Sequence, residues 1–231
     1  MRSIAVSLLA GALAIGVLSS ALASPQFAAT FQMTHKPAKA GASAGIDTLM
    51  TWSDPGEPGA KPKRVTQIKL LFNPGTKITT SAVRRCKASD AAVLRQGAHA
   101  CPPASQIGSA TSRLTTGTGP PAQTAIKFFN ARKQIIVLVR ASGRTLAVYR
   151  DDIVGSTVTV KLDLPSSLSL LELHAQIKPH SSGHGKRRRI YFRNPASCPP
   201  SGQWTTNVVF HYGDGSVQQL SDQTPCVARR S

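Results

Sequence analysis

One serine of this chain stands in a pattern that hydrolases use for nucleophilic attack. The stretch GASAG at 41–45 places Ser43 in a G-x-S-x-G motif, which presents a reactive hydroxyl on a sharp turn between a buried strand and a helix. The residues before the motif are polar and broken by proline, and those after it, IDTLMTW, are typical of a strand. Because the strand–turn–helix context is missing, we interpret Ser43 as a loop residue and predict no catalytic residue.

Three histidines, His174, His180 and His184, lie within one short region and invite comparison with a zinc site. Such a site takes three or four ligands with supporting acceptors, and Glu172 is the one acid close by in the sequence. We interpret HSSGHG at 180–185 as a polar hairpin tip. The sequence predicts neither a metal site nor a cofactor.

Carboxylates are scarce in this chain, which limits acid/base chemistry. There are only 10 Asp and Glu residues, and the adjacent Asp151 and Asp152 would point to opposite faces of a strand. A hydrolase of cell-wall or polysaccharide substrates needs two carboxylates about 5–9.5 Å apart or a serine with a base and an orienting group. The sequence shows neither arrangement. We predict a non-enzymatic protein, with an exported hydrolase as the alternative.

The strongest chemical signal is positive charge. The formal net charge is +18 at pH 7, and GKRRRIYF at 185–192 carries Lys186, Arg187, Arg188 and Arg189 in succession. A field of this sign attracts polyanions over distances near the Debye length, roughly 8 Å at physiological salt. We predict that these four residues contact an acidic partner. The alternative is that the arginines reflect composition and solubility, without a specific ligand.

The first residues decide which acidic partners the chain can meet. Arg2 precedes a mostly apolar run, and Ala21-Leu22-Ala23 has the small-x-small form that signal peptidase accepts. We predict a signal peptide over 1–23, cleaved after Ala23, and a secreted or extracytoplasmic mature chain. The apolar run is shorter than the roughly 20 residues of a spanning helix, which disfavours an uncleaved anchor. Export favours a cell-wall polymer, a polysaccharide or an anionic membrane surface as the partner and disfavours nucleic acid.

Four cysteines, Cys86, Cys101, Cys198 and Cys226, make an even count without a C-x-x-C pair. In an exported chain this pattern indicates disulfides rather than metal binding. Of the three possible pairings we favour Cys86–Cys101 and Cys198–Cys226, because each closes a short local loop. In a chain-entropy model each such bond contributes roughly 3 kcal/mol.

Two of these cysteines open near-copies of one hexapeptide, CPPASQ at 101–106 and CPPSGQ at 198–203. The paired prolines fix φ and lack N–H donors, so we interpret each copy as a stiff, extended segment that leads into a strand. The segments that precede the two copies differ. The mature chain, 24–231, is therefore predicted to be one domain, with two related halves at about 24–120 and 121–231 as the alternative.

Elsewhere the chain indicates short strands separated by turns. The segment 64–72 alternates Thr66, Ile68, Leu70 and Phe72 on one face, and 89–96 is the best helix candidate because Ser89 can cap it. Further strands are expected at 27–35, 46–52, 124–129, 134–141, 144–150, 156–164, 170–177, 188–193 and 203–212. Many short strands with frequent turns predict an all-β, antiparallel two-sheet sandwich, Ig-like or jelly-roll-like, with one short helix and two local disulfides.

The order of cysteine, CPPASQIG, RNPASCPPSGQW (193–204) and a closing TPC (224–226) resembles a group of exported β-rich proteins of high-GC Gram-positive bacteria that carry no assigned activity. The resemblance covers most of the mature chain and implies location and fold, without catalytic residues. The Arg/His-rich segment 178–189 departs from the pattern. We therefore expect a binding or structural role at the cell envelope.

Overall fold

The computed structural model describes residues 28–57 and 59–228, so the predicted signal peptide at 1–23 lies outside the described residues. The long strands are β1 (Ala28–Lys36), β2 (Gly45–Ser53), β3 (Val65–Leu71), β5 (Gln106–Thr115), β6 (Ala122–Asn130), β7 (Gln134–Ala141), β8 (Arg144–Val154), β9 (Thr157–Lys161), β10 (Ser169–Ile177), β14 (Gln203–Tyr212) and β15 (Val217–Pro225). Two-residue strands are β4 (Lys77–Ile78), β11 (Ser181–Ser182), β12 (Arg189–Ile190) and β13 (Phe192–Arg193). The helical elements are α1 (Asp90–Gln96) and the 3₁₀ turns η1 (Thr80–Ala82), η2 (Gly97–Ala100), η3 (Pro103–Ser105) and η4 (Gly185–Arg187).

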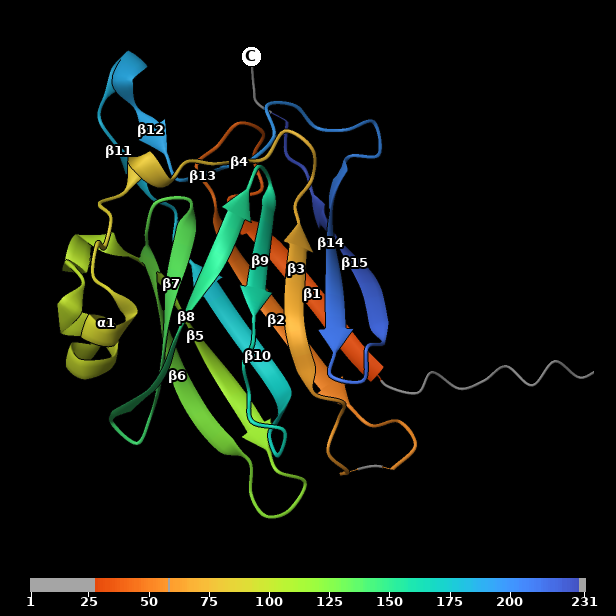
Figure 1. Ribbon diagram of the computed structural model, residues 1–231. Helices are drawn as coiled ribbons and strands as arrows, with labels where there is room; N and C mark the ends of the chain where they lie inside the picture. The colour runs from red at the N-terminus through yellow and green to blue at the C-terminus, as the bar shows by residue number, and fades with distance from the viewer. Residues whose placement is uncertain (1–27, 58, 229–231) are drawn as a thin grey trace, which may run out of the picture.

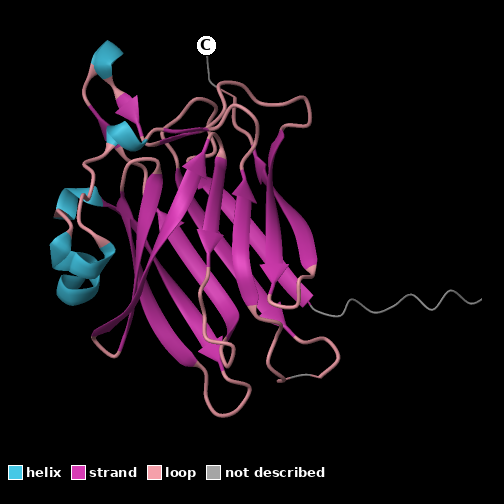
Figure 2. Ribbon diagram, viewed as in Figure 1, coloured by secondary structure: helices cyan, strands magenta, loops and turns pink. Residues whose placement is uncertain are grey.

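The long strands form one sheet rather than two. Its 11 strands follow the order β1-β2-β10-β5-β6-β7-β8-β9-β3-β14-β15, with antiparallel pairing throughout. The sheet curls until its edge strands β1 and β15 contact each other, which gives a nearly closed barrel (Figure 1, Figure 2). The all-β antiparallel prediction is confirmed, and the two-sheet sandwich is wrong. Alternating inward and outward residues look the same in both architectures, so the pattern could not separate them.

The seam between β1 and β15 is held by side chains along the strands and by a short backbone bridge beyond their ends, where the Val227 N–H donates to the Ala38 carbonyl at 2.8 Å and the Ala40 N–H donates to the Val227 carbonyl at 2.9 Å. The Met33 N–H donates to the Asp222 carboxylate at 2.6 Å, and the Thr224 hydroxyl donates to the Met33 carbonyl at 2.9 Å. These bonds join the two edges near the middle of β1. The barrel is therefore closed by contact, with a break in its hydrogen-bonded circuit.

A second hydrophobic core lies outside the barrel, between β7 and α1. The β7 sequence QIIVLVRA contains the apolar run IIVLV because both faces of the strand are covered there. Ile135 and Val137 face the barrel interior, whereas Ile136 and Leu138 are fully buried beneath α1 together with Val93. The predicted strand boundaries at 134–141 are confirmed.

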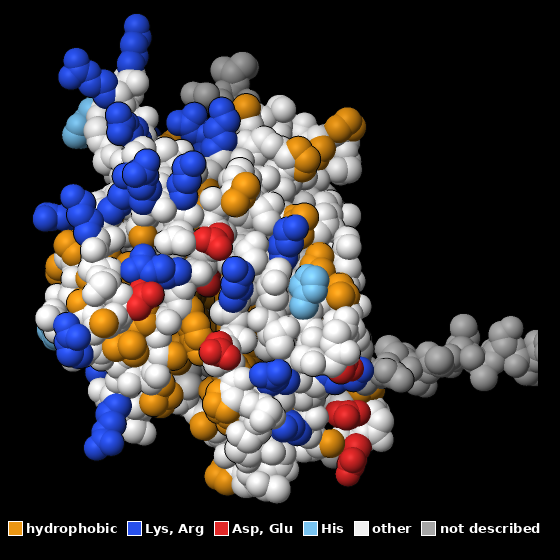
Figure 3. Space-filling model, viewed as in Figure 1, with side chains coloured by type: hydrophobic (Ala, Val, Ile, Leu, Met, Phe, Trp, Pro, Cys, Tyr) orange, Lys and Arg blue, Asp and Glu red, His pale blue; other side chains and the backbone are white. Residues whose placement is uncertain are grey.

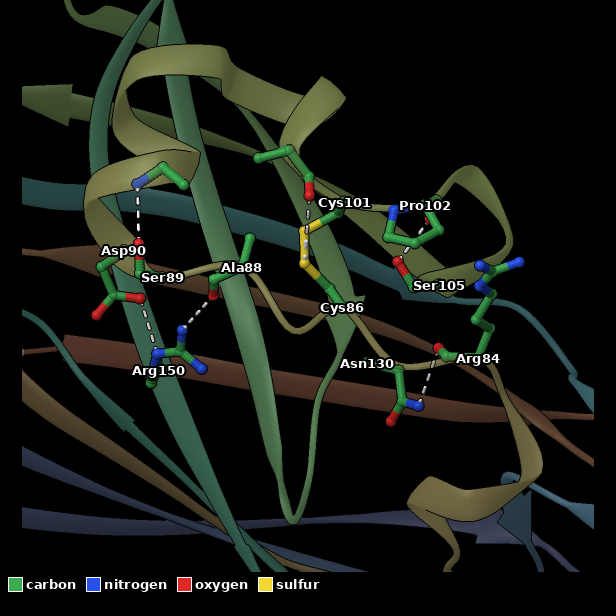
Figure 4. Close-up of a disulfide and its surroundings, with 12 residues drawn as sticks. Arg84, Cys86, Ala88, Ser89, Asp90, Cys101, Pro102, Ser105, Asn130 and Arg150 are labelled. Atoms are coloured by element: carbon green, nitrogen blue, oxygen red, sulfur yellow. Dashed lines mark hydrogen bonds and ion pairs between the residues drawn. A yellow bond between two sulfur atoms is a disulfide. The ribbon is translucent and has the colours of Figure 1, made fainter.

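The predicted helix is confirmed as α1. The Ser89 hydroxyl accepts the Ala92 N–H at 3.3 Å, as an N-cap does, and Gly97 ends the helix with φ of 62°. Arg150 of β8 ties the helix to the barrel, since its guanidinium donates to Asp90 at 2.7 Å and to the Ala88 carbonyl at 2.9 Å (Figure 4). The helix is thus pinned to the outer face of β7 and β8.

Both predicted disulfides are present. Cys86–Cys101 encloses α1, with a Cα–Cα distance of 4.9 Å, and Cys198–Cys226 joins the segment before β14 to the end of β15, at 5.6 Å. Gln106 and Gln203, the last residues of the two hexapeptides, begin β5 and β14. The segments are turns rather than extended chain, because Ser105 N–H bonds the Pro102 carbonyl and Gly202 N–H bonds the Pro199 carbonyl.

Antiparallel connectivity divides the loops between two ends of the barrel. The connections 37–44, 72–105, 131–133, 155–156 and 178–202 leave from the end that carries β11 and β12, at the top of Figure 1, although α1, within 72–105, lies on the side wall. The loops 54–64, 116–121, 142–143, 162–168 and 213–216 lie at the opposite end. No helix in the described part of the chain is long and apolar enough to cross a membrane.

Candidate functional site

The barrel encloses an apolar cavity, here called the interior channel. Its volume is about 160 Å³, and its walls come from β1 to β10 together with Tyr191 and Phe192. Representative lining residues from six strands are Met50, Leu70, Ile126, Val137, Val160 and Leu173. An apolar cavity of roughly 150 Å³ in an engineered protein stays dry and takes up benzene. The interior channel is close to that cavity in volume and in the apolar character of its lining.

The interior channel is long and narrow. Leu170 and Ile177, at the two ends of β10, both line it, and a strand of this length spans on the order of 20 Å. A volume of about 160 Å³ spread over that length leaves room for a thin chain. Tyr191 and Phe192, each 2 % exposed, close the end below β12 and β13.

The wall of the barrel has a gap between β8 and β9. These strands pair only through Asp152, Ile153 and Val154, next to their connecting turn, and β8 then slants away from β9 (Figure 1). Across the gap, the Tyr149 hydroxyl donates to the Asp163 carbonyl at 3.4 Å, a long and weak hydrogen bond.

Apolar side chains stand at this gap. Tyr149, Leu162 and Leu164 line the interior channel and are only partly buried, and Leu146 of β8 is 57 % exposed. Figure 3 shows hydrophobic side chains gathered in a hollow on this face. The gap is the place where the interior channel approaches solvent.

One acid faces the interior channel. Asp151 of β8 is 4 % exposed, and its Oδ1 has no hydrogen-bond partner within the described residues. Burial, and secondarily the neighbouring charge of Asp152, raises the pKa of Asp151 well above its ordinary value. Asp152 faces the other way and accepts the Gln134 amide at 2.9 Å. The expectation that this pair points to opposite faces is confirmed.

Asp151 is a candidate site residue that the sequence pattern did not reveal. The strand containing it was expected to end at Arg150, whereas β8 runs on to Val154. Aspartate is depleted in strands, so the adjacent Asp151 and Asp152 indicate the end of a strand. The signal that could have found the site is the inward register Ala147, Tyr149, Asp151, Ile153, which places one carboxyl among apolar neighbours.

The four predicted polyanion contacts lie together at one end of the barrel. Lys186 and Arg187 are in η4, Arg188 follows it, and Arg189 begins β12, and all four side chains are exposed. Tyr191 does not share a face with Arg187 and Arg189 as a continuous strand would require, because the chain is a protruding loop up to Arg188. The hairpin-tip interpretation of 180–185 is confirmed.

Further cations stand beside them, and we call the whole group the basic end. Besides the four predicted residues, it comprises Lys77, Arg84, Arg85 and Lys87. η1, just before Arg84, contacts β12, and β4 with Lys77 pairs with β13. None of these eight cations forms an ion pair with a described carboxylate, and Figure 3 shows Lys and Arg side chains crowded there.

Asn130 holds the loop that presents part of the basic end. Its fully buried amide donates to the carbonyls of Thr80, Val83 and Arg84 at 2.9, 2.8 and 3.2 Å (Figure 4). The adjacent Cys86–Cys101 bond fixes the same loop from its other side. The positions of Arg84, Arg85 and Lys87 are thus set by the fold, whereas 186–189 project from it.

Ser43 and the three histidines are not brought together. Ser43 lies in the loop between β1 and β2, and its hydroxyl donates to the backbone carbonyl of His180 at 3.3 Å. His180 donates from its ring to the Ile107 carbonyl at 3.0 Å, and His174 contacts Asp47 at 2.8 Å on the barrel wall. Within the described residues no three His, Cys, Asp or Glu side chains form a group that could hold a metal ion.

No protein-family model matches this chain, and a search of curated proteins gives no match.

Proposed function

We propose that this chain is an exported, non-enzymatic binding protein that holds an apolar ligand inside its barrel. The observation that carries the proposal is the interior channel, about 160 Å³ lined almost wholly by aliphatic and aromatic side chains. Burying an apolar ligand there releases about 25 cal/mol for each Å² of apolar surface removed from water. Tyr149, Leu162 and Leu164 line the interior channel at the gap between β8 and β9 and are only partly buried, so we infer that the ligand enters there.

Several further observations fit this role. The two disulfides suit an oxidising compartment, in agreement with the predicted signal peptide at 1–23 and with the resemblance to exported β-rich proteins. The hydrolase alternative needs a serine beside a base or a pair of facing carboxylates. The described structure gives Ser43 a backbone partner and turns Asp151 and Asp152 apart.

The test is a matched pair of variants on β10. Ala175 lines the interior channel and the next residue, Gln176, points outward. We expect a neutral naphthylamine dye to bind the wild-type chain with a rise in fluorescence. Ala175→Phe should weaken dye binding about tenfold, because it fills the space, whereas Gln176→Phe should leave binding unchanged. Absence of dye binding to the wild type, or equal loss in both variants, would contradict the proposal.

The segregation of charge favours a second candidate function, contact with an acidic cell-wall polymer through the basic end. Eight cations lie there without a described carboxylate partner, whereas the loops at the opposite end carry Asp54, Glu57, Asp163 and Asp214 together with Lys61, Lys63 and Arg64, so that end is close to neutral. Such an arrangement orients the molecule in the field of a polyanion. This contact and ligand binding in the interior channel use different surfaces, so one chain can perform both.

A further inference from the structure

The interior channel has one acidic lining residue, Asp151, and this residue lies beside the gap between β8 and β9. Asp152 pairs with Thr159 where β8 and β9 still run together, and Asp151 is the adjacent residue on the channel side. Its carboxyl group therefore sits at the apex of the gap, just inside the wall. A ligand that enters past Tyr149, Leu162 and Leu164 would come within reach of this group.

Three buried polar atoms of the channel wall have no hydrogen-bond partner within the described residues. Asp151 Oδ1, the Tyr191 hydroxyl and the Thr48 hydroxyl all belong to channel-lining residues and make no hydrogen bond within the described chain. Leaving a buried polar atom unsatisfied costs about 1–3 kcal/mol. A purely hydrocarbon ligand would leave these atoms as they are, whereas a ligand with a hydrogen-bonding group can satisfy one of them.

The shape of the channel restricts the rest of the ligand. The volume of about 160 Å³, lined from one end of β10 to the other, suits an extended aliphatic chain. The residues that line the channel are aliphatic or aromatic, apart from a few hydroxyl side chains and Asp151. Polarity at one point and hydrocarbon along the remainder is the pattern of a single-chain amphiphile.

We propose that the ligand is one linear aliphatic chain ending in a neutral hydroxyl or carboxylic acid group, with that group at Asp151 and the hydrocarbon along the interior channel. This inference rests on the proposed function and names its ligand class. A neutral carboxyl at Asp151 both donates and accepts a hydrogen bond, as the hydroxyl or acid group of the ligand does. The raised pKa of Asp151 agrees with a neutral side chain.

Two probes of equal length test the inference, decan-1-ol and 1-fluorodecane, each measured by displacement of the naphthylamine dye. We expect the alcohol to bind the wild-type chain about tenfold more tightly, the worth of one buried hydrogen bond. Asp151→Leu should abolish this preference while both probes still bind. Asp151→Asn, which keeps a donor and an acceptor in the same place, should retain it.

The outcomes separate the two proposals. If neither probe nor dye binds the wild type, the proposed function itself fails. If both probes bind equally to the wild type, or if the preference survives in Asp151→Leu, the polar group does not sit at Asp151 and the inference is overturned. A thermal melt of each variant confirms that it is folded. Tyr191→Phe serves as the comparison, since loss of preference there alone would move the polar group to Tyr191 and equally overturn the inference.

Discussion

Individual residues in this barrel show how strongly burial controls ionisable groups. Besides Asp151, the buried His35 of β1 packs against the rings of Phe72, Phe192 and Trp204. Its Nδ1 contacts the Asn194 side-chain oxygen at 2.8 Å, and its Nε2 has no partner within the described residues. Burial lowers the pKa of His35 below 6.5, although the Asn194 contact opposes that shift. The ring is therefore a neutral part of the core.

The lowered pKa of His35 makes stability depend on pH in a definite direction. Below pH 6.5 the unfolded chain binds a proton at His35 that the folded chain does not, so acidification favours unfolding. The raised pKa of Asp151 acts in the opposite direction, because there the folded chain binds the proton more readily than the unfolded chain. We therefore expect acidification from pH 7 to pH 5 to lower the free energy of unfolding more in the wild type than in His35→Gln. Urea denaturation of both proteins at several pH values measures this difference. The exposed His99 supplies the control, and a His99→Gln effect as large as that of His35→Gln would contradict the assignment.

At the scale of elements, much of the fold was readable from local patterns. The strands at 134–141 and 203–212 and the helix beginning after Ser89 were predicted at their observed boundaries, because alternation and capping are local signals. Closure into a barrel was not readable. It depends on pairings between distant segments, such as β2 with β10 and β3 with β14, and no local pattern specifies these partners.

The same limit applies to the candidate site. The cationic run at 186–189 is contiguous and was visible in the sequence, whereas the interior channel is assembled from ten strands. The segment 188–193 was expected to be one strand, but it breaks at Tyr191, whose ring turns inward to close the channel. The sequence around Tyr191 does not show whether this aromatic residue belongs to a strand or closes the end of the channel.

The position of α1 outside β7 leads to a prediction about the disulfide Cys86–Cys101, which encloses this helix. Cys86–Cys101 has a sequence separation of 15, and removing it with Cys86→Ala and Cys101→Ala should lower the free energy of unfolding by about 3 kcal/mol. Because α1 packs on the outer face of the barrel, dye binding in the interior channel should persist. Urea denaturation and dye titration of the double variant test both statements, and unchanged stability would show that the bond does not constrain the unfolded chain.

At the scale of the whole molecule, the distribution of charge is the dominant feature. The unpaired cations of the basic end and the mixed, nearly balanced charges of the opposite end give the barrel a long-range electrical polarity. The strength of its attraction to a polyanion falls steeply as the ionic strength rises. The molecule should therefore meet an acidic polymer with the loops around β11 and β12 foremost, which leaves the gap between β8 and β9 on the side wall uncovered.

Heparin chromatography tests this orientation. We expect Arg187→Ser, Arg188→Ser and Arg189→Ser together to elute at clearly lower salt than the wild type, because three exposed cations of the basic end are lost. The matched control changes Lys127, Arg144 and Lys161, which lie away from that end, to serine and so removes the same charge. If both triple variants elute together, net charge alone governs retention and the basic end has no special part in it.

The seam between β1 and β15 has a mechanical consequence for a binding protein of this shape. A fully hydrogen-bonded cylinder has a fixed girth, since widening it anywhere ruptures a row of backbone bonds. Here the two edges are joined through Met33, Asp222 and Thr224 and, just beyond the strand ends, through two backbone hydrogen bonds of Val227 with Ala38 and Ala40. Widening the barrel at this seam would therefore break a few contacts while every pair of long strands in the sheet stays intact.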